Sequence, residues 1–481
     1  MSSHLLFQRL SCLPRWPWIL IVVGLVPRII LSFGSSPVLW PDSITYLGSA
    51  ALMADQGNYW LHEIYRTPLY PLFLSIPMRI FGHTAETGEC IVFLQRIMGI
   101  ASGLLLFLIL RRAFNHRVAF GGSVLFLISP LQLFYETSLL TEVQFIFFLF
   151  VFLWIAGAML ERGHLTPLAH RWFVALGLLG AILSLSRPIG QLLLLAVLVY
   201  YFFQFGFSRR LFFGAATSLL VFFVGVFPWL KINHDHYGFW GISRDFGINL
   251  YHRVIDVDRT PLPPISSDEF IRDIYLKAAQ KPQVTYFTVY HALLRKLRRE
   301  GDRRTVKLRA DQRMGDFAKE VLLSSPGQFI PNSISNFFHL FIASRRSVHF
   351  CSGGDGTPYL CSNHEGMSTR SVQVNPERPS ALWRQLVSWM FRALVIPDVV
   401  VAFLCLVGVF ASLRLGAGPP AAKSQRLAIL LSILYFTLLA ALFNCPEDRF
   451  RLPVDGFIYG FAIYGVLVTG GCILHRWSVR R

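Results

Sequence analysis

The sequence VLWPDSITYLGSAALMADQGNYWLHEIYRTPLYPLFL occupies residues 38–74 and follows an apolar run, residues 16–33, that is long enough to cross a bilayer. This stretch carries acids, an arginine and two prolines among aromatic residues. It is too polar to continue the span, yet it becomes apolar again at its end. It therefore predicts a structured loop at the membrane edge instead of a simple turn.

The composition of the whole chain indicates a membrane protein. Of its 481 residues, 54% are hydrophobic and only 15% are charged, whereas soluble domains contain about 25% charged residues. The 45 Lys and Arg residues exceed the 27 Asp and Glu residues and give a formal net charge of +18. Much of this excess falls in short loops, as in the cytoplasmic loops of membrane proteins. It therefore predicts contact with membrane lipids and no nucleic-acid partner.

Apolar runs of about 20 residues predict an all-α polytopic fold. The ten candidate spans are 16–33, 90–110, 118–135, 142–160, 172–187, 189–207, 211–230, 397–414, 427–444 and 454–474. Two further apolar pieces, 328–343 and 383–396, either lie on the membrane or cross it as an extra pair, so we expect ten to twelve transmembrane helices. Every second connection is basic, which predicts that both termini are cytoplasmic.

The spans divide the chain into three predicted parts. These are a transmembrane module over 1–230 with a first outer loop at 34–89, an extracytoplasmic region over 231–396, and C-terminal transmembrane helices over 397–481. We expect two short helices in the first outer loop, at about 43–56 and 69–81. The second is short and contains prolines, which favours a helix that lies in the membrane interface.

The first polar cluster on the outer side is Asp42 with Ser43. One interpretation is a helix N-cap, because Pro-Asp-Ser precedes an apolar-periodic stretch. The other is a general base at the bilayer edge, where burial and neighbouring charges tune a carboxylate. The two interpretations do not exclude each other.

Arginines supply the other outer clusters. Arg66 suits either an interfacial side chain that reaches the head groups or a phosphate ligand, since a guanidinium binds two phosphate oxygens at once. Arg187 ends one apolar run and begins the next, where an unpartnered cation is costly. Arg449 and Arg451 follow Glu447 and Asp448 in a short outer loop, against the usual charge bias.

Other motifs are weaker. The triplet DVD at 256–258 matches a metal-binding pattern of soluble transferases, but no nucleotide-binding βαβ pattern surrounds it. The triplet HDH at 234–236 has no further ligands at suitable spacing, so we predict no metal ligands. Cys351 and Cys361 flank a glycine-rich loop, and they form a disulfide if that loop faces an oxidising compartment.

Taken in chain order, these clusters resemble the GT-C membrane glycosyltransferases, in particular the branch of protein O-mannosyltransferases and lipid A aminoarabinose transferases. The resemblance begins in the first outer loop and covers most of the chain. The segments that carry it are PDSITYLGSA, YRTPLYPLFL, SLLTEVQF, LSLSRPIGQ, FPWLKINHDHYGFWGISRDFGINL (228–250), LLSSPGQFIPNSISNFF (322–338) and EDRFRLPV (447–454).

The resemblance implies a GT-C bundle that transfers a sugar from a polyprenyl-phosphate donor to an acceptor on the outer face. Asp42 would be the general base that deprotonates the acceptor. The residues assigned to the donor phosphate are Arg66, Arg187, Arg449 and Arg451. Further substrate-binding candidates are Ser43, Tyr46, Glu142 and Lys231. Lys231 takes this role because Ile232 stands where family members often carry an arginine.

The same resemblance implies a multi-pass protein of the cell (inner) membrane with its active site on the periplasmic side. The acceptor is a glycolipid, a polysaccharide or a protein. No cofactor is required by the motifs, and a divalent metal is left open. The alternative function is a lipid or solute transporter or flippase, which would move its cargo without covalent change.

Overall fold

The computed structural model describes residues 15–479 except for short gaps. These gaps are 59–63, 162–168, 264–266, 279–284, 301–304, 343–347, 353–357, 363–380, 395, 415–418 and 444–447.

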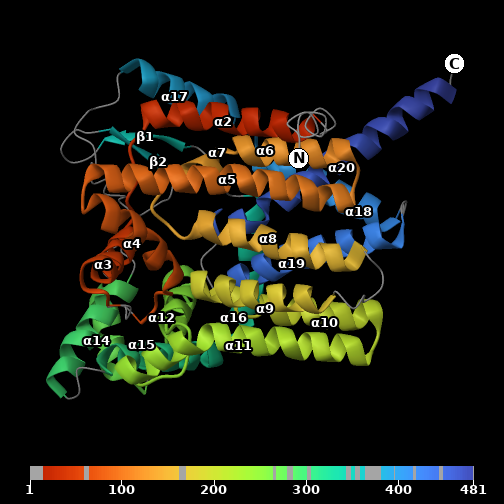
Figure 1. The fold of residues 1–481 in the computed structure, drawn as a ribbon. Helices are drawn as coiled ribbons and strands as arrows, with labels where there is room; N and C mark the ends of the chain where they lie inside the picture. The colour runs from red at the N-terminus through yellow and green to blue at the C-terminus, as the bar shows by residue number, and fades with distance from the viewer. Residues whose placement is uncertain are drawn as a thin grey trace.

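Long helices run side by side and form a bundle (Figure 1). They are α2 (Trp16–Gly34), α5 (Ala85–Ala113), α6 (His116–Ile128), α7 (Pro130–Thr137), α8 (Glu142–Glu161), α9 (Ala169–Ser186), α10 (Leu193–Phe205), α11 (Arg209–Tyr237), α18 (Asp398–Arg414), α19 (Pro420–Phe443) and α20 (Asp448–Val479), with the short 3-10 turn η1 (Pro188–Gly190) before α10. The prediction of an all-α polytopic protein is confirmed.

Nine of the ten predicted spans each coincide with one helix of this bundle, and the span predicted at 118–135 is divided between α6 and α7. Within the described ranges, eight helical segments are long and apolar enough to cross a membrane, or nine if α6 and α7 count as one bent span. The predicted span at 172–187 is a shorter apolar helix, His170–Ser186. α6 and α7 meet at 48°, where Pro130 cannot donate a backbone hydrogen bond.

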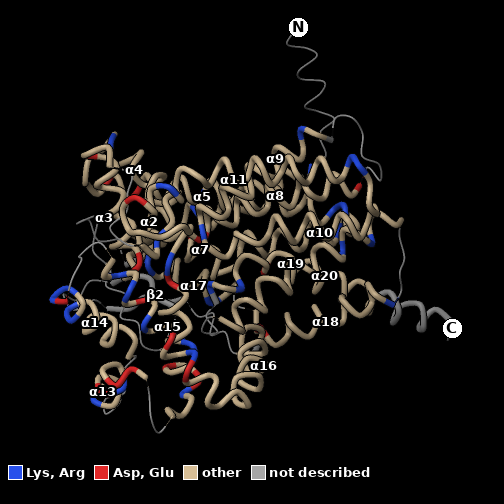
Figure 2. Tube along the Cα trace, turned by 90° about the horizontal axis from the view of Figure 1, so that it is seen from below, with Lys and Arg blue, Asp and Glu red and all other residues tan. Residues whose placement is uncertain are grey.

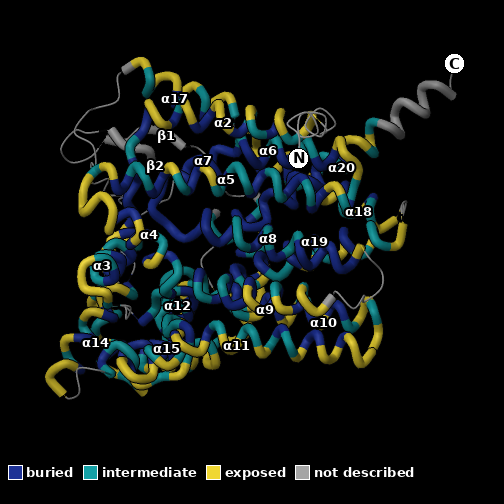
Figure 3. The backbone as a smooth tube through the Cα atoms, in the orientation of Figure 1, coloured by how far each residue is buried: buried dark blue, intermediate teal, exposed yellow. Residues whose placement is uncertain are grey.

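Sequence explains where each helix lies in the bundle. α8 is apolar on every face and is buried along most of its length, as expected for a central helix. α18 instead exposes a stripe at Phe403, Leu406, Phe410 and Leu413, which suits contact with lipid. Figure 3 shows this contrast between the buried centre and the exposed outer helices.

Shorter elements gather at one end of the bundle (Figure 1). They are α3 (Pro41–Gln56), α4 (Leu69–Phe81), α12 (Phe246–Tyr251), the π-helix η2 (His252–Val257), α13 (Glu269–Ala278), α14 (Tyr286–Glu300) and α15 (Val306–Ser324). Two other helices pack along the bundle: α16 (Pro326–Ile342) against α18 and α19, and α17 (Ala381–Leu394) against α2. α12, η2 and α13 to α15 enclose a core of their own around Tyr251, Leu293 and Phe317. Acidic residues concentrate at this end, whereas the opposite end carries mainly basic residues (Figure 2). We refer to this end as the loop end.

A two-stranded antiparallel sheet of β1 (Val348–Ser352) and β2 (Pro358–Ser362) was not predicted from the sequence. Cys351 pairs in register with Tyr359, and Cys361 pairs with His349. The predicted disulfide falls on side chains outside the described ones, so it stays a prediction.

The first outer loop is fastened to the segment that joins α7 to α8. The Val38 amide donates to the carbonyl of Thr137 at 2.9 Å, and the Leu139 amide donates to the carbonyl of Val38 at 3.0 Å. The Ser43 hydroxyl donates to the carbonyl of Leu139 at 2.8 Å. These bonds fix the start of α3, which carries Asp42.

A fully buried glutamine links the other end of this loop to the same segment. The Gln95 amide donates to the carbonyls of Glu136 and Ser138, at 3.0 and 2.8 Å. Its side-chain oxygen accepts the hydroxyl of Tyr70, in α4, at 2.7 Å. Glu136 is held in turn by an ion pair with Arg28 at 2.5 Å. Both ends of the first outer loop therefore attach to residues 136–139.

Candidate functional site

Asp42 lies in the first turn of α3, where its carboxylate meets two arginines. Its Oδ1 accepts from Nη2 of Arg66 at 2.7 Å, and its Oδ2 accepts from Nη1 of Arg449 at 3.2 Å. The N-cap of α3 is Trp40, and Asp42 is the second residue of the helix, so the predicted N-cap position of Asp42 is wrong. Burial would raise the pKa of the Asp42 carboxyl, but the two guanidiniums outweigh burial and hold that pKa well below its usual value. The carboxylate is still 35% exposed, so a substrate can reach it.

The guanidinium of Arg66 is occupied on all three nitrogens. Besides Asp42, it donates to the Thr45 hydroxyl at 2.9 Å and to the Tyr46 hydroxyl at 3.3 Å. Its central carbon lies 4.6 Å from the ring centre of Tyr46 and 5.0 Å from that of Tyr65. Such stacking and bonding fix an arginine in one place. Arg66 thus holds the Asp42 carboxylate in a defined orientation.

A second ion pair lies close to the first. Arg187 contacts Oε1 of Glu142 at 2.9 Å. The Thr67 hydroxyl donates to the carbonyl of Ser186 at 2.7 Å. Since Arg66 precedes Thr67 and Arg187 follows Ser186, this bond brings the two arginines into the same region.

Phe450 joins the two ion pairs from the side of α20. The ring centre of Phe450 lies 5.0 Å from the guanidinium carbon of Arg449 and 6.0 Å from that of Arg187. The site therefore gathers three arginines and two carboxylates from five segments of the chain. We call Asp42, Arg66, Glu142, Arg187 and Arg449 the charged cluster; its formal charge is +1 at neutral pH.

Tyr46 lies between the two ion pairs. Burial raises the pKa of its hydroxyl, and the charges of Arg66, Asp42, Glu142 and Arg187 all act on it. Its ring meets that of Tyr70 edge to face at 5.2 Å. This position agrees with the predicted substrate-binding role, which no contact with a ligand tests.

The other predicted site residues have partners elsewhere. Ser43 is fully buried, and its hydroxyl accepts the Trp40 amide while it donates to Leu139. Lys231 pairs with Asp235 at 2.8 Å on the exposed end of α11. These two roles in substrate binding stay predictions.

Arg451 is 2% exposed and pairs with two buried acids. Its Nε donates to Asp455 at 2.7 Å, and its Nη2 donates to Asp398 at 3.3 Å. Its Nη1 donates to the carbonyl of Leu340. These contacts join α16, α18 and α20, which favours a structural role for Arg451 over contact with a phosphate.

One acid near the cluster carried no prediction. Asp245 lies in the loop before α12. In this loop, the backbone amide of Arg244 donates to the carbonyl of Ile64 at 2.9 Å. Burial and the neighbouring charge of Asp311 raise the pKa of Asp245 to about 6, while the charge of Arg66 lowers it. Asp245 therefore lies within electrostatic range of Arg66. Its place within the 228–250 segment was the only signal in the sequence.

The weak motifs take structural roles. Asp256 accepts the amides of Thr285 and Tyr286 at the start of α14, so it caps that helix. Asp258 pairs with Arg253. Across the described part of the chain, no group of three His, Cys, Asp or Glu side chains is arranged to hold a metal ion.

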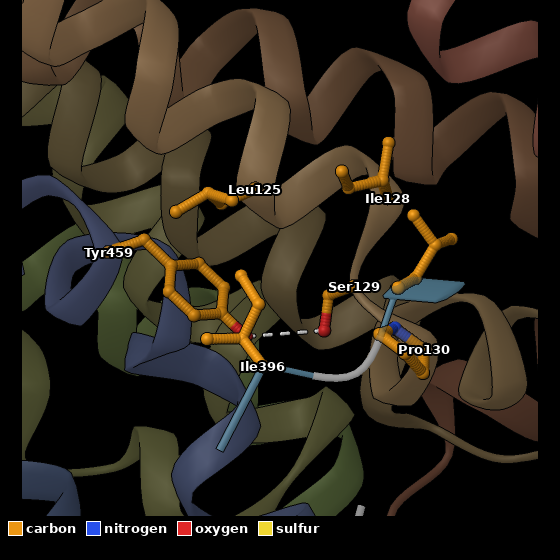
Figure 4. Close-up of a pocket in the computed structure, with 7 residues that line it drawn as sticks. Leu125, Ile128, Ser129, Pro130, Ile396 and Tyr459 are labelled. Atoms are coloured by element: carbon orange, nitrogen blue, oxygen red, sulfur yellow. Dashed lines mark hydrogen bonds between the residues drawn. The ribbon is translucent and has the colours of Figure 1, made fainter. Parts of the chain in front are cut away.

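A small pocket lies at the break between α6 and α7 (Figure 4). It is lined by Leu125, Ile128, Ser129, Pro130, Leu394, Ile396 and Tyr459. The hydroxyls of Ser129 and Tyr459 are hydrogen-bonded at 3.3 Å. Because its lining includes no charged side chain, this pocket is suited neither to phosphate binding nor to acid–base chemistry. The charged cluster remains the candidate site.

Comparison with known families identifies a matching segment. Residues 65–230 match the sequence profile of the family described as dolichyl-phosphate-mannose-protein mannosyltransferase. This range holds Arg66, Glu142 and Arg187, whereas Asp42 and Arg449 lie outside it. No curated protein matches the sequence.

Three solved structures are similar to the chain. The apo oligosaccharyltransferase of Archaeoglobus fulgidus gives a TM-score of 0.50 and 14% identity, over 96% of this chain and 52% of that one. AglB of the same organism, in complex with an inhibitory peptide and a dolichol-phosphate, gives 0.49 and 14%, over 99% and 52%. ArnT from Cupriavidus metallidurans, bound to undecaprenyl phosphate, gives 0.37 and 14%, over 94% and 77%.

The chain spans about half the length of the archaeal oligosaccharyltransferases that it matches. The predicted resemblance to the GT-C membrane glycosyltransferases is confirmed by the matched segment and by the fold.

Proposed function

We propose that this protein is a membrane glycosyltransferase that moves a sugar from a polyprenyl-phosphate donor to an acceptor at the loop end. The observation that supports this most is the charged cluster, in which a partly exposed carboxylate lies among arginines at the edge of an apolar bundle. The matched mannosyltransferase profile supports the same class of reaction. The loop end would face the periplasm in a cell (inner) membrane.

In this reaction, Asp42 accepts the proton of the acceptor's nucleophile. The nucleophile forms a bond to the anomeric carbon of the sugar while the bond from that carbon to the phosphate oxygen breaks. The electron pair leaves with the polyprenyl phosphate, whose negative charge grows as the bond breaks. Cations fixed at this place lower the barrier more than they tighten substrate binding.

The contacts of the arginines support a division of labour among them. We assign Arg66 to the orientation of Asp42, because its three nitrogens are already occupied. Arg449 and Arg187 then hold the phosphate of the donor, flanked by Phe450. The long apolar tail of the donor would lie along the lipid-facing side of the bundle.

The test is product analysis with the purified full chain in proteoliposomes. A panel of polyprenyl-phosphate sugars is supplied together with cell-envelope extract as the source of glycolipid, polysaccharide and protein acceptors. We expect mass spectrometry to detect released polyprenyl phosphate and an acceptor heavier by one sugar. Movement of the lipid across the membrane without either product would support the flippase alternative and refute glycosyl transfer.

A further inference from the structure

Both oxygens of the Asp42 carboxylate are occupied in this structure. One bonds to Arg66 and the other to Arg449. A carboxylate that accepts two charge-assisted hydrogen bonds is a weak base, because the neighbouring cations favour its ionised form. The proposed base is therefore masked in the state that the structure shows.

The two arginines that mask Asp42 contact it at different distances. Arg66 is fixed by Thr45 and Tyr46 and stacks against two tyrosine rings. Arg449 approaches Asp42 through Nη1 at 3.2 Å, which is 0.5 Å longer than the Arg66 bond at 2.7 Å. An incoming anion would therefore displace Arg449 from Asp42 more easily than Arg66.

The position of Arg449 also favours an exchange of partners. Its guanidinium lies beside Phe450, whose ring also flanks Arg187. A phosphate bound by Arg187 would thus lie within the region that Arg449 can reach by a change of side-chain rotamer. Guanidiniums bind phosphate in a bidentate manner, so the phosphate competes with Asp42 for the same donors.

We infer that Arg449 moves from Asp42 to the phosphate of the donor, and that this exchange unmasks Oδ2 of Asp42 so that it accepts the proton of the acceptor. This inference rests on the proposed function and assigns it an order: the donor binds before the acceptor is activated. Without donor, the base stays paired and cannot activate water.

Chemical labelling tests the exchange directly. A water-soluble carbodiimide with an amine nucleophile modifies accessible carboxyl groups, and mass spectrometry quantifies modification at Asp42. The full-length protein in nanodiscs is labelled with and without a polyprenyl phosphate that carries no sugar. We expect labelling of Asp42 to rise about tenfold with the lipid, which corresponds to about 1.4 kcal/mol.

Asp55 supplies the internal control, because it lies on the same helix and is exposed. Its labelling should not change with the lipid. In the Arg449→Gln variant, the labelling of Asp42 should be as high without the lipid as it is with the lipid. If Arg449→Gln does not fold, Arg449→Lys serves, and we expect intermediate labelling without lipid. Equal labelling of wild-type Asp42 in both conditions would refute the exchange.

Steady-state kinetics supply the second readout. With the donor bound first, a dead-end analogue of the acceptor should be an uncompetitive inhibitor against the donor. Competitive or noncompetitive inhibition would contradict the inferred order of binding. It would not contradict the proposed glycosyl transfer. Lipid-dependent labelling without any sugar transfer would instead refute the proposed function and leave the exchange intact.

Discussion

At the scale of single residues, the partners of an arginine decide what it does in this protein. Arg66 donates one hydrogen bond to Asp42 and two more to Thr45 and Tyr46. Arg451 joins three helices through two buried acids and a backbone carbonyl. Arg449 shares Asp42 with Arg66 but has the longer bond. In the function that we propose, the same type of side chain would orient a base, fasten helices and bind an anion.

Replacement of Asp42 by Asn separates proton transfer from structure. The amide keeps the shape of the side chain but cannot accept the proton, so turnover should fall by at least about a hundredfold. Donor binding should persist, and single-turnover release of polyprenyl phosphate measures the loss. Asp55→Asn on the same helix should keep full turnover. If the Asp42→Asn enzyme turned over at the wild-type rate, Asp42 would not be the base, and Glu142 would become the candidate.

Arg449 and Arg451 should respond differently to the same substitution. Arg449→Ala should lower kcat/KM for the donor by an amount that corresponds to about 1.5–3 kcal/mol. Arg449→Lys should restore only part of this loss, because an ammonium lacks the planar, two-pronged geometry of a guanidinium. Arg451→Ala removes the buried cation that contacts both Asp398 and Asp455. It should lower the unfolding temperature markedly. The assignment fails if Arg451→Ala folds normally and loses only donor use.

Asp245 should make stability depend on pH. Its pKa is raised from 3.8 to about 6, so the native state binds more protons than the unfolded state between these values. Stability from this group is therefore present at low pH and is lost as the pH rises toward 6. Asp245→Asn should remove this dependence of stability on pH. At pH values above 6, the variant should unfold at a higher temperature than the wild type. Thermal unfolding in detergent across this range measures it; an unchanged profile contradicts it.

Residue identity and order pointed to every member of the charged cluster. The structure brings together the five predicted residues Asp42, Arg66, Glu142, Arg187 and Arg449. Their pairing could not be predicted, because it depends on how Thr67 meets Ser186 after the loop has closed. The structural partners of Arg451 come from α16 and α18, which no local pattern connects to it.

At the scale of elements, the first outer loop is positioned by residues 136–139. The start of α3 bonds to this segment directly, and α4 reaches it through Gln95. The sequence predicted both short helices because their apolar spacing is local. It could not show that residues about a hundred positions later would hold them. The β1–β2 pair was missed because strands of five residues carry little periodicity.

Tyr70→Phe tests this attachment with the loss of one hydroxyl. The bond to Gln95 disappears, so α4 should shift slightly relative to Asp42 and lower kcat, since small misplacements are costly in catalysis. The KM for the donor should stay the same. Tyr200→Phe is the matched control, because its hydroxyl bonds to the Ser424 carbonyl between α10 and α19. Equal kcat values for both variants would show that the Tyr70 bond is only structural.

At the scale of the whole molecule, acidic residues gather at the end of the bundle where α3 and α4 lie (Figure 2). The long apolar runs were sufficient to predict the helices of the bundle, because a span must satisfy its backbone within itself. The helical packing of 244–324 was harder to predict, since its core depends on contacts among several short amphipathic helices.

The basic short loops predict the orientation of the protein in the membrane. In a background without the seven native cysteines, a cysteine placed at Trp240 should react with an impermeant maleimide in intact cells. A cysteine at Asn115 should react only after the membrane is opened. Labelling of position 115 from outside would reverse the predicted orientation and place the charged cluster in the cytoplasm.

The contact between Asp42 and Arg449 joins residues that are 407 positions apart. During synthesis, the ribosome must therefore add nearly the whole remaining chain, and the translocon must insert the last helix, before the second cation reaches the carboxylate. A stalled or truncated nascent chain would hold the first outer loop without this arginine. Assembly of the charged cluster is thus a late step of biogenesis, and premature termination yields a product that lacks Arg449.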